Sequence, residues 1–158
     1  MGIATTKKSI LNLRVIILLM GLILTWIAMR SYSPAHKLDS RPYYSYDQAV
    51  IYLQGLSELQ KQNYFKAEMF DFWFMINYTW LLLLAFKKYV INKKNYWPAF
   101  VPGILDLFET LLITSYLYMG EFNWAHQLLP VFSTLKWLSA ILIPLYIGKT
   151  LFLRRANR

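Results

Sequence analysis

The chain contains no cysteine. Disulfide bonds, thiolate metal sites and cysteine nucleophiles are therefore excluded, and cysteine usage says nothing about the redox compartment. Charged residues are also scarce: they make up 16% of the 158 residues, whereas 57% are hydrophobic and 18% are aromatic. Soluble domains carry about 25% charged residues, so this composition favours a membrane protein. The length allows one domain, residues 1–158.

Familiar catalytic fingerprints are also missing. The sequence has no P-loop, no glycine-rich dinucleotide fingerprint, no Gly-x-Ser-x-Gly elbow and no His-Glu-x-x-His helix. No cofactor is therefore expected. The formal net charge is +9, but the aromatic residues lie in apolar runs and near their ends rather than among the basic residues. This pattern favours basic membrane loops over a nucleic-acid partner.

Four apolar segments are long enough to cross a bilayer, which takes about 20 helical residues. They cover about residues 10–29, 67–86, 98–119 and 128–147. The first also resembles a signal peptide, because basic residues precede its apolar core, but no clean cleavage site follows it. The predicted fold class is an all-α membrane protein, a bundle of four transmembrane helices that forms a single integral membrane domain.

The polar region between the first two spans contains a helix signal. Ser45 followed by Gln48 fits a capping box. Apolar residues then recur at helical spacing. The sequence predicts a short amphipathic helix over about residues 46–61, which either lies on the membrane or packs on the loop side of the bundle.

Basic residues predict the orientation of the bundle. They gather at the N-terminus, in residues 87–94 and at the C-terminus, whereas the loop after the third span has Glu121 and neither Lys nor Arg. With four spans, these three basic regions fall on one side, so both termini are expected to be cytoplasmic. The expected location is a bacterial inner membrane or, in a eukaryote, the endoplasmic reticulum.

Charged residues lie inside the last three spans. An ionised group in a bilayer costs several kcal/mol, so such groups usually face the protein interior and pair with one another. Glu68 falls in the first turn of its predicted span, where an acidic side chain suits the membrane interface. The full set is Glu68, Asp71, Asp106, Glu109 and Lys136.

Helical spacing groups these residues with tyrosines. Asp71 and Tyr78 share one face of the second span, and Asp106, Glu109 and Tyr116 share one face of the third. The two helices are antiparallel, so the acids of each should meet the tyrosine of the other. We expect Tyr78 near Asp106 and Glu109, and Tyr116 near Asp71 and its neighbour in the previous turn, Glu68.

Depth in the membrane predicts an ion pair. Lys136 lies roughly 12 Å from the outer boundary and Glu109 roughly 16 Å from the inner one, at 1.5 Å per residue. In a core of about 30 Å these levels nearly coincide. We therefore expect a Lys136–Glu109 pair, with Asp106 and Asp71 as alternative partners. Four acids against one lysine leave excess negative charge, so some carboxyls should be protonated, wet or bound to a cation.

Two further expectations concern polar side chains. Asn77 is expected to form a hydrogen bond between helices. A metal site is not expected, because carboxylate-bridged bundles use a Glu-x-x-His motif. Both histidines of this chain, His36 and His126, lie in predicted loops.

Part of the chain resembles a known family. Tyr64-Phe65-Lys66 leading into Asp71, the aromatic run over residues 70–74, and the acids Asp106 and Glu109 resemble the EXPERA group, which includes emopamil-binding sterol isomerases and the sigma-2 receptor type. The resemblance covers about residues 64–158. It implies a four-helix membrane protein with a lipid-like ligand, in which Asp71 contacts a cationic amine or cation-like intermediate. The isomerases' histidine has no counterpart in these spans, and Lys136 is not an expected feature.

These patterns lead to a functional hypothesis. The protein is expected to bind or isomerise a hydrophobic, lipid-like molecule between the second, third and fourth spans, with Asp71, Asp106 and Glu109 as candidate catalytic acids. The candidate ligand-binding residues are Trp73, Met75, Tyr78, Tyr116, Lys136 and Trp137. Alternative functions are a non-enzymatic accessory or assembly subunit and a small proton-coupled transporter. Membrane lipids are the expected partners, with a second copy of the chain or another membrane protein as further alternatives.

Overall fold

The computed structural model describes residues 2–33, 37–89 and 96–156, and all regular elements in this part of the chain are helices. Four helical segments are long and apolar enough to cross a membrane, which confirms the predicted helical class and the number of candidate spans. The helices are α1 (Gly2–Tyr32), η1 (Leu38–Ser40), α2 (Tyr46–Gln54), α3 (Glu58–Tyr89), η2 (Trp97–Phe100), α4 (Val101–Met119), η3 (Trp124–Leu128) and α5 (Leu129–Ala156), where η marks a 3-10 helix.

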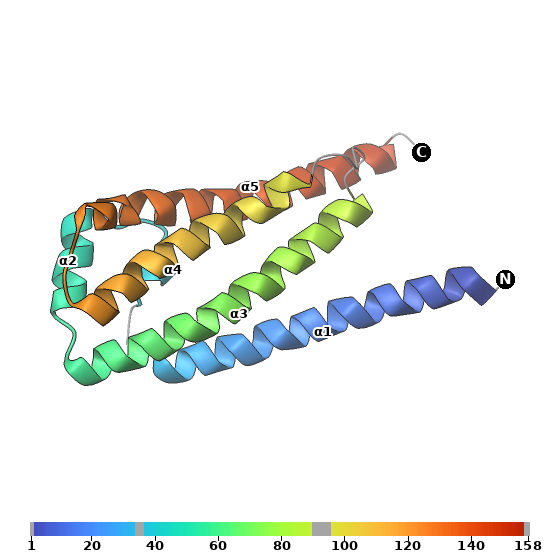
Figure 1. The fold of residues 1–158 in the computed structure, drawn as a ribbon. Coiled ribbons are helices and arrows are strands. Elements are labelled where there is room, and N and C mark those ends of the chain that lie inside the picture. The colour runs from blue at the N-terminus through green and yellow to red at the C-terminus, as the bar shows by residue number, and fades with distance from the viewer. Residues whose placement is uncertain (1, 34–36, 90–95, 157–158) are drawn as a thin grey trace.

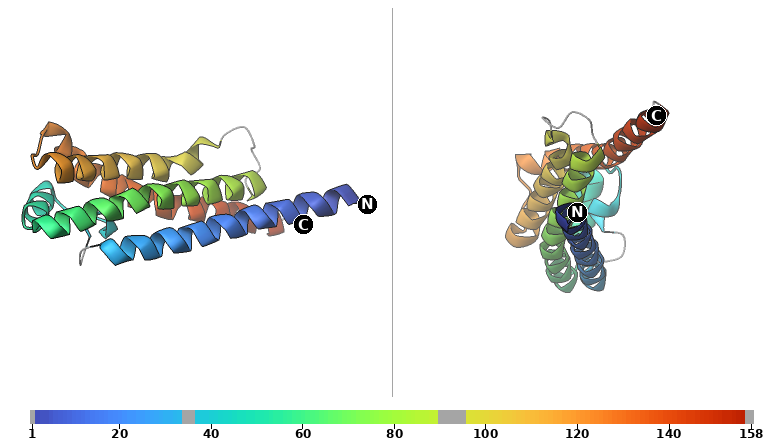
Figure 2. Two further views of the ribbon diagram at one scale, coloured as in Figure 1. Left: turned by 60° about the horizontal axis from the view of Figure 1, so that its bottom comes forward. Right: turned by 90° about the vertical axis from the view of Figure 1, so that its right-hand side faces the viewer.

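The long helices form an elongated bundle (Figure 1). Helix α1 packs along α3, which in turn packs against α4, and α4 packs against α5. Both chain ends lie at one end of the bundle, whereas α2 lies across the opposite end (Figures 1 and 2). The segment from Lys37 to Ser45, which connects α1 to α2, is therefore at the end that is remote from the termini.

The predicted helix over residues 46–61 is correct at its start and wrong at its end. Ser45 and Gln48 form the expected capping box, but α2 stops at Gln54 and Gly55 caps it. A second box then starts α3: the side chain of Ser57 accepts from the backbone N–H of Gln60, and the Gln60 side chain accepts from that of Ser57. Because Ser57 starts a new helix, the second long helix begins well before residue 67.

Helix α4 also has well-defined ends. Pro102 lies in the first turn of α4, so it starts this helix rather than kinking it, and Gly120 ends the helix with a left-handed φ of 76°.

His126, expected in a loop, is fully buried in η3. Its Nδ1 accepts from the Asn123 N–H at 3.0 Å, and its Nε2 lies 3.1 Å from the carbonyl oxygen of Leu112. This histidine thus joins η3 to α4. His36 lies outside the described residues.

Two contacts define the antiparallel register of α1 and α3. The ring of Tyr32 stacks on that of Phe70, with centroids 5.8 Å apart. Further along, a Cβ atom on Gly21 would lie 2.5 Å from Oδ1 of Asn77, so glycine permits the close approach there. Asn77 donates to the carbonyl of Trp73 in its own helix at 2.7 Å, so the expected hydrogen bond between helices is wrong. Its contribution to the α1–α3 contact is instead steric.

Candidate functional site: a buried charge cluster beside a cavity

Lys136 of α5 lies at the centre of the buried polar cluster. Its Nζ is 2.5 Å from Oε2 of Glu109, 3.0 Å from Oδ1 of Asp106 and 3.1 Å from the backbone carbonyl of Asp39. The predicted Lys136–Glu109 pair is therefore confirmed, and the alternative partner Asp106 is bound as well. An ammonium group has three N–H donors, so all of them have acceptors here.

Two tyrosines bind the acids of α4. Tyr78 of α3 donates to Oδ2 of Asp106 at 2.9 Å, which confirms the expected meeting of these residues. Tyr44, which comes just before α2, donates to Oε1 of Glu109 at 2.7 Å. Burial and the nearby Glu109 carboxylate both raise the pKa of the Tyr44 hydroxyl, so it remains a donor. Nothing in the sequence singles out Tyr44, which lies in the polar region between the first two apolar segments.

A second ion cluster adjoins the first. Lys37 Nζ lies 2.7 Å from Oδ2 of Asp39 and 2.8 Å from Oε1 of Glu68. Burial lowers the pKa of Lys37, but attraction to Asp39 and Glu68 outweighs this effect and holds the pKa well above its usual value. The expected interfacial position of Glu68 is wrong, because α3 begins at Glu58 and the Glu68 side chain is completely buried inside it.

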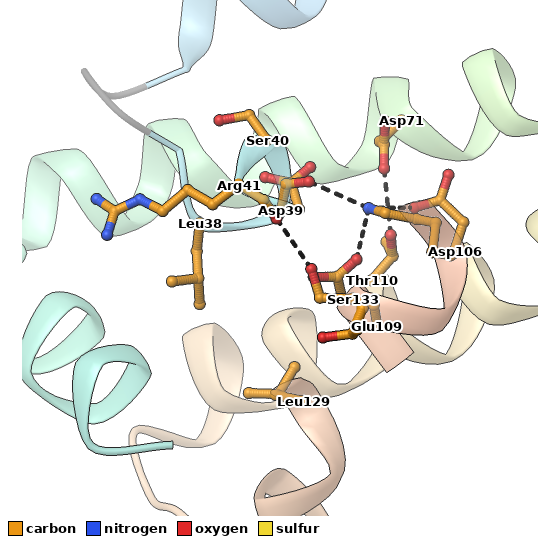
Figure 3. Close-up of polar contacts among 12 residues, drawn as sticks. Leu38, Asp39, Ser40, Arg41, Asp71, Asp106, Glu109, Thr110, Leu129 and Ser133 are labelled. Carbon is orange, nitrogen blue, oxygen red and sulfur yellow. Dashed lines mark hydrogen bonds and ion pairs between the residues drawn. The ribbon is translucent and has the colours of Figure 1, made fainter. Parts of the chain in front are cut away.

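The segment before α2 is folded into the end of the bundle. The Leu38 N–H donates to the hydroxyl of Tyr64 at 3.2 Å, and the Ser133 hydroxyl donates to the carbonyl of Arg41 at 3.1 Å. Figure 3 shows Asp39 facing the acids of α3 and α4, whereas the Arg41 side chain points away from them. Charge balance could not have identified this segment, because it contributes one cation, Lys37, together with one acid, Asp39.

Asp71 of α3 differs from the other buried acids. Its Oδ2 accepts a hydrogen bond from the hydroxyl of Thr110 at 3.2 Å. Within the described ranges, four of the five buried carboxylates form an ion pair with Lys37 or Lys136, and Asp71 does not. Two ammonium groups against five carboxylates leave a formal excess of three negative charges.

Three carboxylates of the cluster lie close enough to share a cation. Oxygen atoms of Asp39, Glu68 and Asp71 lie within 4.8 Å of one another. The ammonium group of Lys37 already contacts two of them. Lys37 thus supplies a cation to Asp39 and Glu68, whereas Asp71 has no ion pair among the described residues.

A cavity of about 1180 Å³ lies beside the charge clusters. It is bounded by α1, α3, α4, α5 and the segment 37–40, so α1 contributes a wall that the sequence did not predict. Of the candidate site residues, five line it: Asp71, Tyr78, Asp106, Lys136 and Trp137. The other lining residues are Trp26, Met29, Arg30, Ser33, Lys37, Asp39, Ser40, Phe74, Leu81, Leu82, Ala85, Pro102 and Ala140.

The remaining candidate residues lie elsewhere. Glu109 is completely buried behind Lys136 and is not part of the cavity lining. Trp73 is 61% exposed on the outside of α3. Met75 packs near Gly103, and the Tyr116 ring stacks on that of Phe122 at a centroid distance of 4.2 Å. The prediction that Trp73, Met75 and Tyr116 line the ligand cavity is therefore wrong, whereas Glu109 has its predicted partner Lys136 without facing the cavity.

No protein-family model, curated protein or solved structure matches this chain. The resemblance to the EXPERA group therefore stays a prediction. The function has to be argued from the cavity and the charged groups that line it.

Proposed function

We propose that the protein is an integral membrane protein that binds a lipid-like molecule in the cavity. The observation that carries the proposal is the combination of charged and apolar walls around one space of about 1180 Å³. Small-molecule sites usually measure about 300–1,000 Å³. A larger cavity with long apolar walls suits an acyl chain or a ring system with a polar head.

Four apolar helices support insertion in a membrane. The most apolar stretch of α1 has no buried residue, so a surrounding lipid phase would cover side chains that water would otherwise contact. The two chain ends lie together at one end of the bundle (Figure 1), and the sequence is basic near both. This arrangement supports cytoplasmic termini, in a bacterial inner membrane or in the endoplasmic reticulum.

The cavity lining suggests how an amphiphile would bind. Asp39, Asp71 and Asp106 provide a charged region where a polar head can replace water. Apolar side chains supply the surface for a hydrophobic tail; they are Trp26, Phe74, Leu81, Leu82, Ala85, Trp137 and Ala140. Charged groups within a membrane usually face such an interior, because ionised groups facing lipid are costly.

The geometry favours binding over isomerisation. An isomerase would need an acid that reaches the substrate and gives up a proton. Glu109 is outside the cavity lining, and both Asp106 oxygens already accept hydrogen bonds, from Lys136 and Tyr78. Asp71, the acid that the EXPERA resemblance singles out, does line the cavity. We therefore assign Asp71 a ligand-binding role and Asp106 and Glu109 a supporting one.

Lipid occupancy of the purified protein tests the proposal. The parent protein, extracted in a mild detergent, is expected to retain a lipid-like molecule that native mass spectrometry detects. Ala140→Trp places a large ring in the cavity and should remove this molecule. Leu145→Trp is the matched control, because Leu145 is on the same helix, is 63% exposed and does not line the cavity. Equal occupancy in folded Ala140→Trp and in the parent would contradict the proposal.

A further inference from the structure

Two charged side chains face the same cavity and form no ion pair with any of the described residues. Asp71 forms no ion pair within the described part of the chain. Its side chain is nevertheless buried, with a relative exposure of only 6%. Thr110 donates to one of its oxygens. A carboxylate in such a position gains from a cationic donor, and the cavity is the space from which one can approach.

Arg30, near the end of α1, is the second such group. Its guanidinium lies over the ring of Trp26, 5.5 Å from the centroid. It forms no ion pair with any carboxylate of the described residues, and it lines the cavity together with Trp26. A guanidinium presents a planar set of donors that matches phosphate and carboxylate groups, so an anionic group would complete this side.

The helix register places these two groups at a similar level. Tyr32 stacks on Phe70, and the helices run antiparallel from there. Arg30 therefore lies beside the turn of α3 that includes Asp71, and both side chains border one cavity. Opposite charges at one level that do not contact each other form a site for a ligand carrying both signs.

From this arrangement we infer that the cavity binds a zwitterionic head group, with a primary ammonium on Asp71 and a phosphate on Arg30. The inference rests on the proposed binding of an amphiphile and names its chemical class. A primary ammonium donates hydrogen bonds to carboxylate oxygens, which a quaternary ammonium does not do. The apolar lining favours a lipid that carries this head, such as a phosphatidylethanolamine, over the free water-soluble head group.

Binding to the unmodified protein in detergent micelles tests the head group. Four ligands separate the contributions: phosphatidylethanolamine, phosphatidylglycerol with the same acyl chains, a long-chain alkylamine and free O-phosphoethanolamine. Trp26 and Trp137 line the cavity, so their fluorescence reports binding. Phosphatidylethanolamine should bind about tenfold or more tightly than each of the other three, since each lacks one charged or apolar contact.

Charge-neutral variants assign the two contacts. Asp71→Asn should abolish the preference over phosphatidylglycerol, and Arg30→Gln should abolish the preference over the alkylamine. Asp47→Asn and Lys66→Gln are the matched controls. Asp47 is exposed on α2, and Lys66 lies over the Tyr32 ring at the same end of α1, yet neither lines the cavity. Both controls should retain the preferences of the parent.

The outcomes separate this inference from the proposed function. Equal affinity for phosphatidylethanolamine and phosphatidylglycerol, or unchanged preferences in Asp71→Asn and Arg30→Gln, would overturn the zwitterionic site while leaving a lipid-binding cavity. Free O-phosphoethanolamine binding as tightly as the lipid would overturn the lipid as its source. If no amphiphile bound and no lipid copurified, the proposed function itself would fail.

Discussion

The hydroxyl of Tyr44 lies 2.7 Å from Oε1 of Glu109 and ties the segment before α2 to the middle of α4. Both side chains are completely buried. The contact connects a residue of the polar linker with one of the apolar spans, and it supplies Glu109 with a donor on the side opposite Lys136. Tyr44 is therefore part of the charge cluster.

Tyr44→Phe is expected to destabilise the protein by about 1.5–3 kcal/mol, because a buried carboxylate loses a hydrogen bond that water cannot replace. The melting temperature in detergent, monitored as loss of the folded peak in size-exclusion chromatography, measures the effect. Tyr43→Phe is the control, since Tyr43 is adjacent in sequence and 68% exposed. If both variants unfold at the parent temperature, the hydrogen bond has no role in stability.

Lys136→Met is expected to be among the most damaging single substitutions. It leaves Glu109 and Asp106 without their cation, and breaking a buried pair on one side costs about 3–5 kcal/mol. Adding Glu109→Gln should restore part of the loss, because it removes one unpaired charge. A double variant less stable than Lys136→Met, at neutral pH in the same detergent, would argue against direct coupling of the two residues.

Lys37→Met tests the second ion cluster in the same assay. It removes the cation between Asp39 and Glu68 and should destabilise the protein by a similar amount. Lys61→Met supplies the comparison, because the partner of Lys61 is Glu58, whose side chain is 83% exposed. Such surface pairs contribute about 0–1 kcal/mol. Equal effects of the two substitutions would show that Lys37 is not a structural cation.

Gly21→Leu is expected to separate α1 from α3. A side chain at this position would overlap the Asn77 amide, and overpacking typically costs about 1–3 kcal/mol. Gly148→Leu is the control, since a Cβ there meets nothing within 4 Å. Because α1 forms one wall of the cavity, Gly21→Leu should also reduce copurified lipid, which Gly148→Leu should retain.

Alkaline pH should weaken the contacts of Lys37 and Tyr44, which both lie outside the apolar spans. Their pKa values in the folded protein lie above the ordinary 10.5 and 10.0. A group whose pKa is raised by folding contributes its full stabilisation at pH values below its pKa in the unfolded chain. This stabilisation is lost as the pH rises through the pKa of the folded state. The difference in melting temperature between the parent and Tyr44→Phe should therefore be constant below about pH 10 and shrink above it. A difference that grows in this range would contradict the assignment.

The parts of the site that the sequence predicted are those set by helix geometry. Depth counted along two apolar spans was enough to pair Lys136 with Glu109, and residue spacing was enough to bring Tyr78 to Asp106. When two straight helices pack antiparallel, residues at the same depth along the bundle lie next to each other. The same reasoning failed for Tyr116, which is buried on the expected face of α4 but stacks on Phe122, because spacing within a helix does not predict how the following loop folds back.

The linker could not be predicted in this way. Lys37, Asp39 and Tyr44 lie in a polar, proline-containing segment with no periodicity, which usually indicates a solvated loop. The route of that segment into the bundle is defined by acceptors and donors on distant helices, such as Tyr64 and Ser133. The contribution of α1 to the cavity could not be predicted either. Its apolar core carries no charged residue that would indicate which face packs against the other helices.

The hydrogen bonds from α5 to the linker have a consequence for the order of assembly. Lys136 and Ser133 donate to carbonyls of Asp39 and Arg41, which are made much earlier in synthesis. Until α5 has been synthesised, the linker lacks these two donors, although Lys37 can already pair with Asp39 and with Glu68 of α3. The polar end of the cavity therefore depends on α5, the last of the described helices to be synthesised, for two of the hydrogen bonds that hold the linker in place.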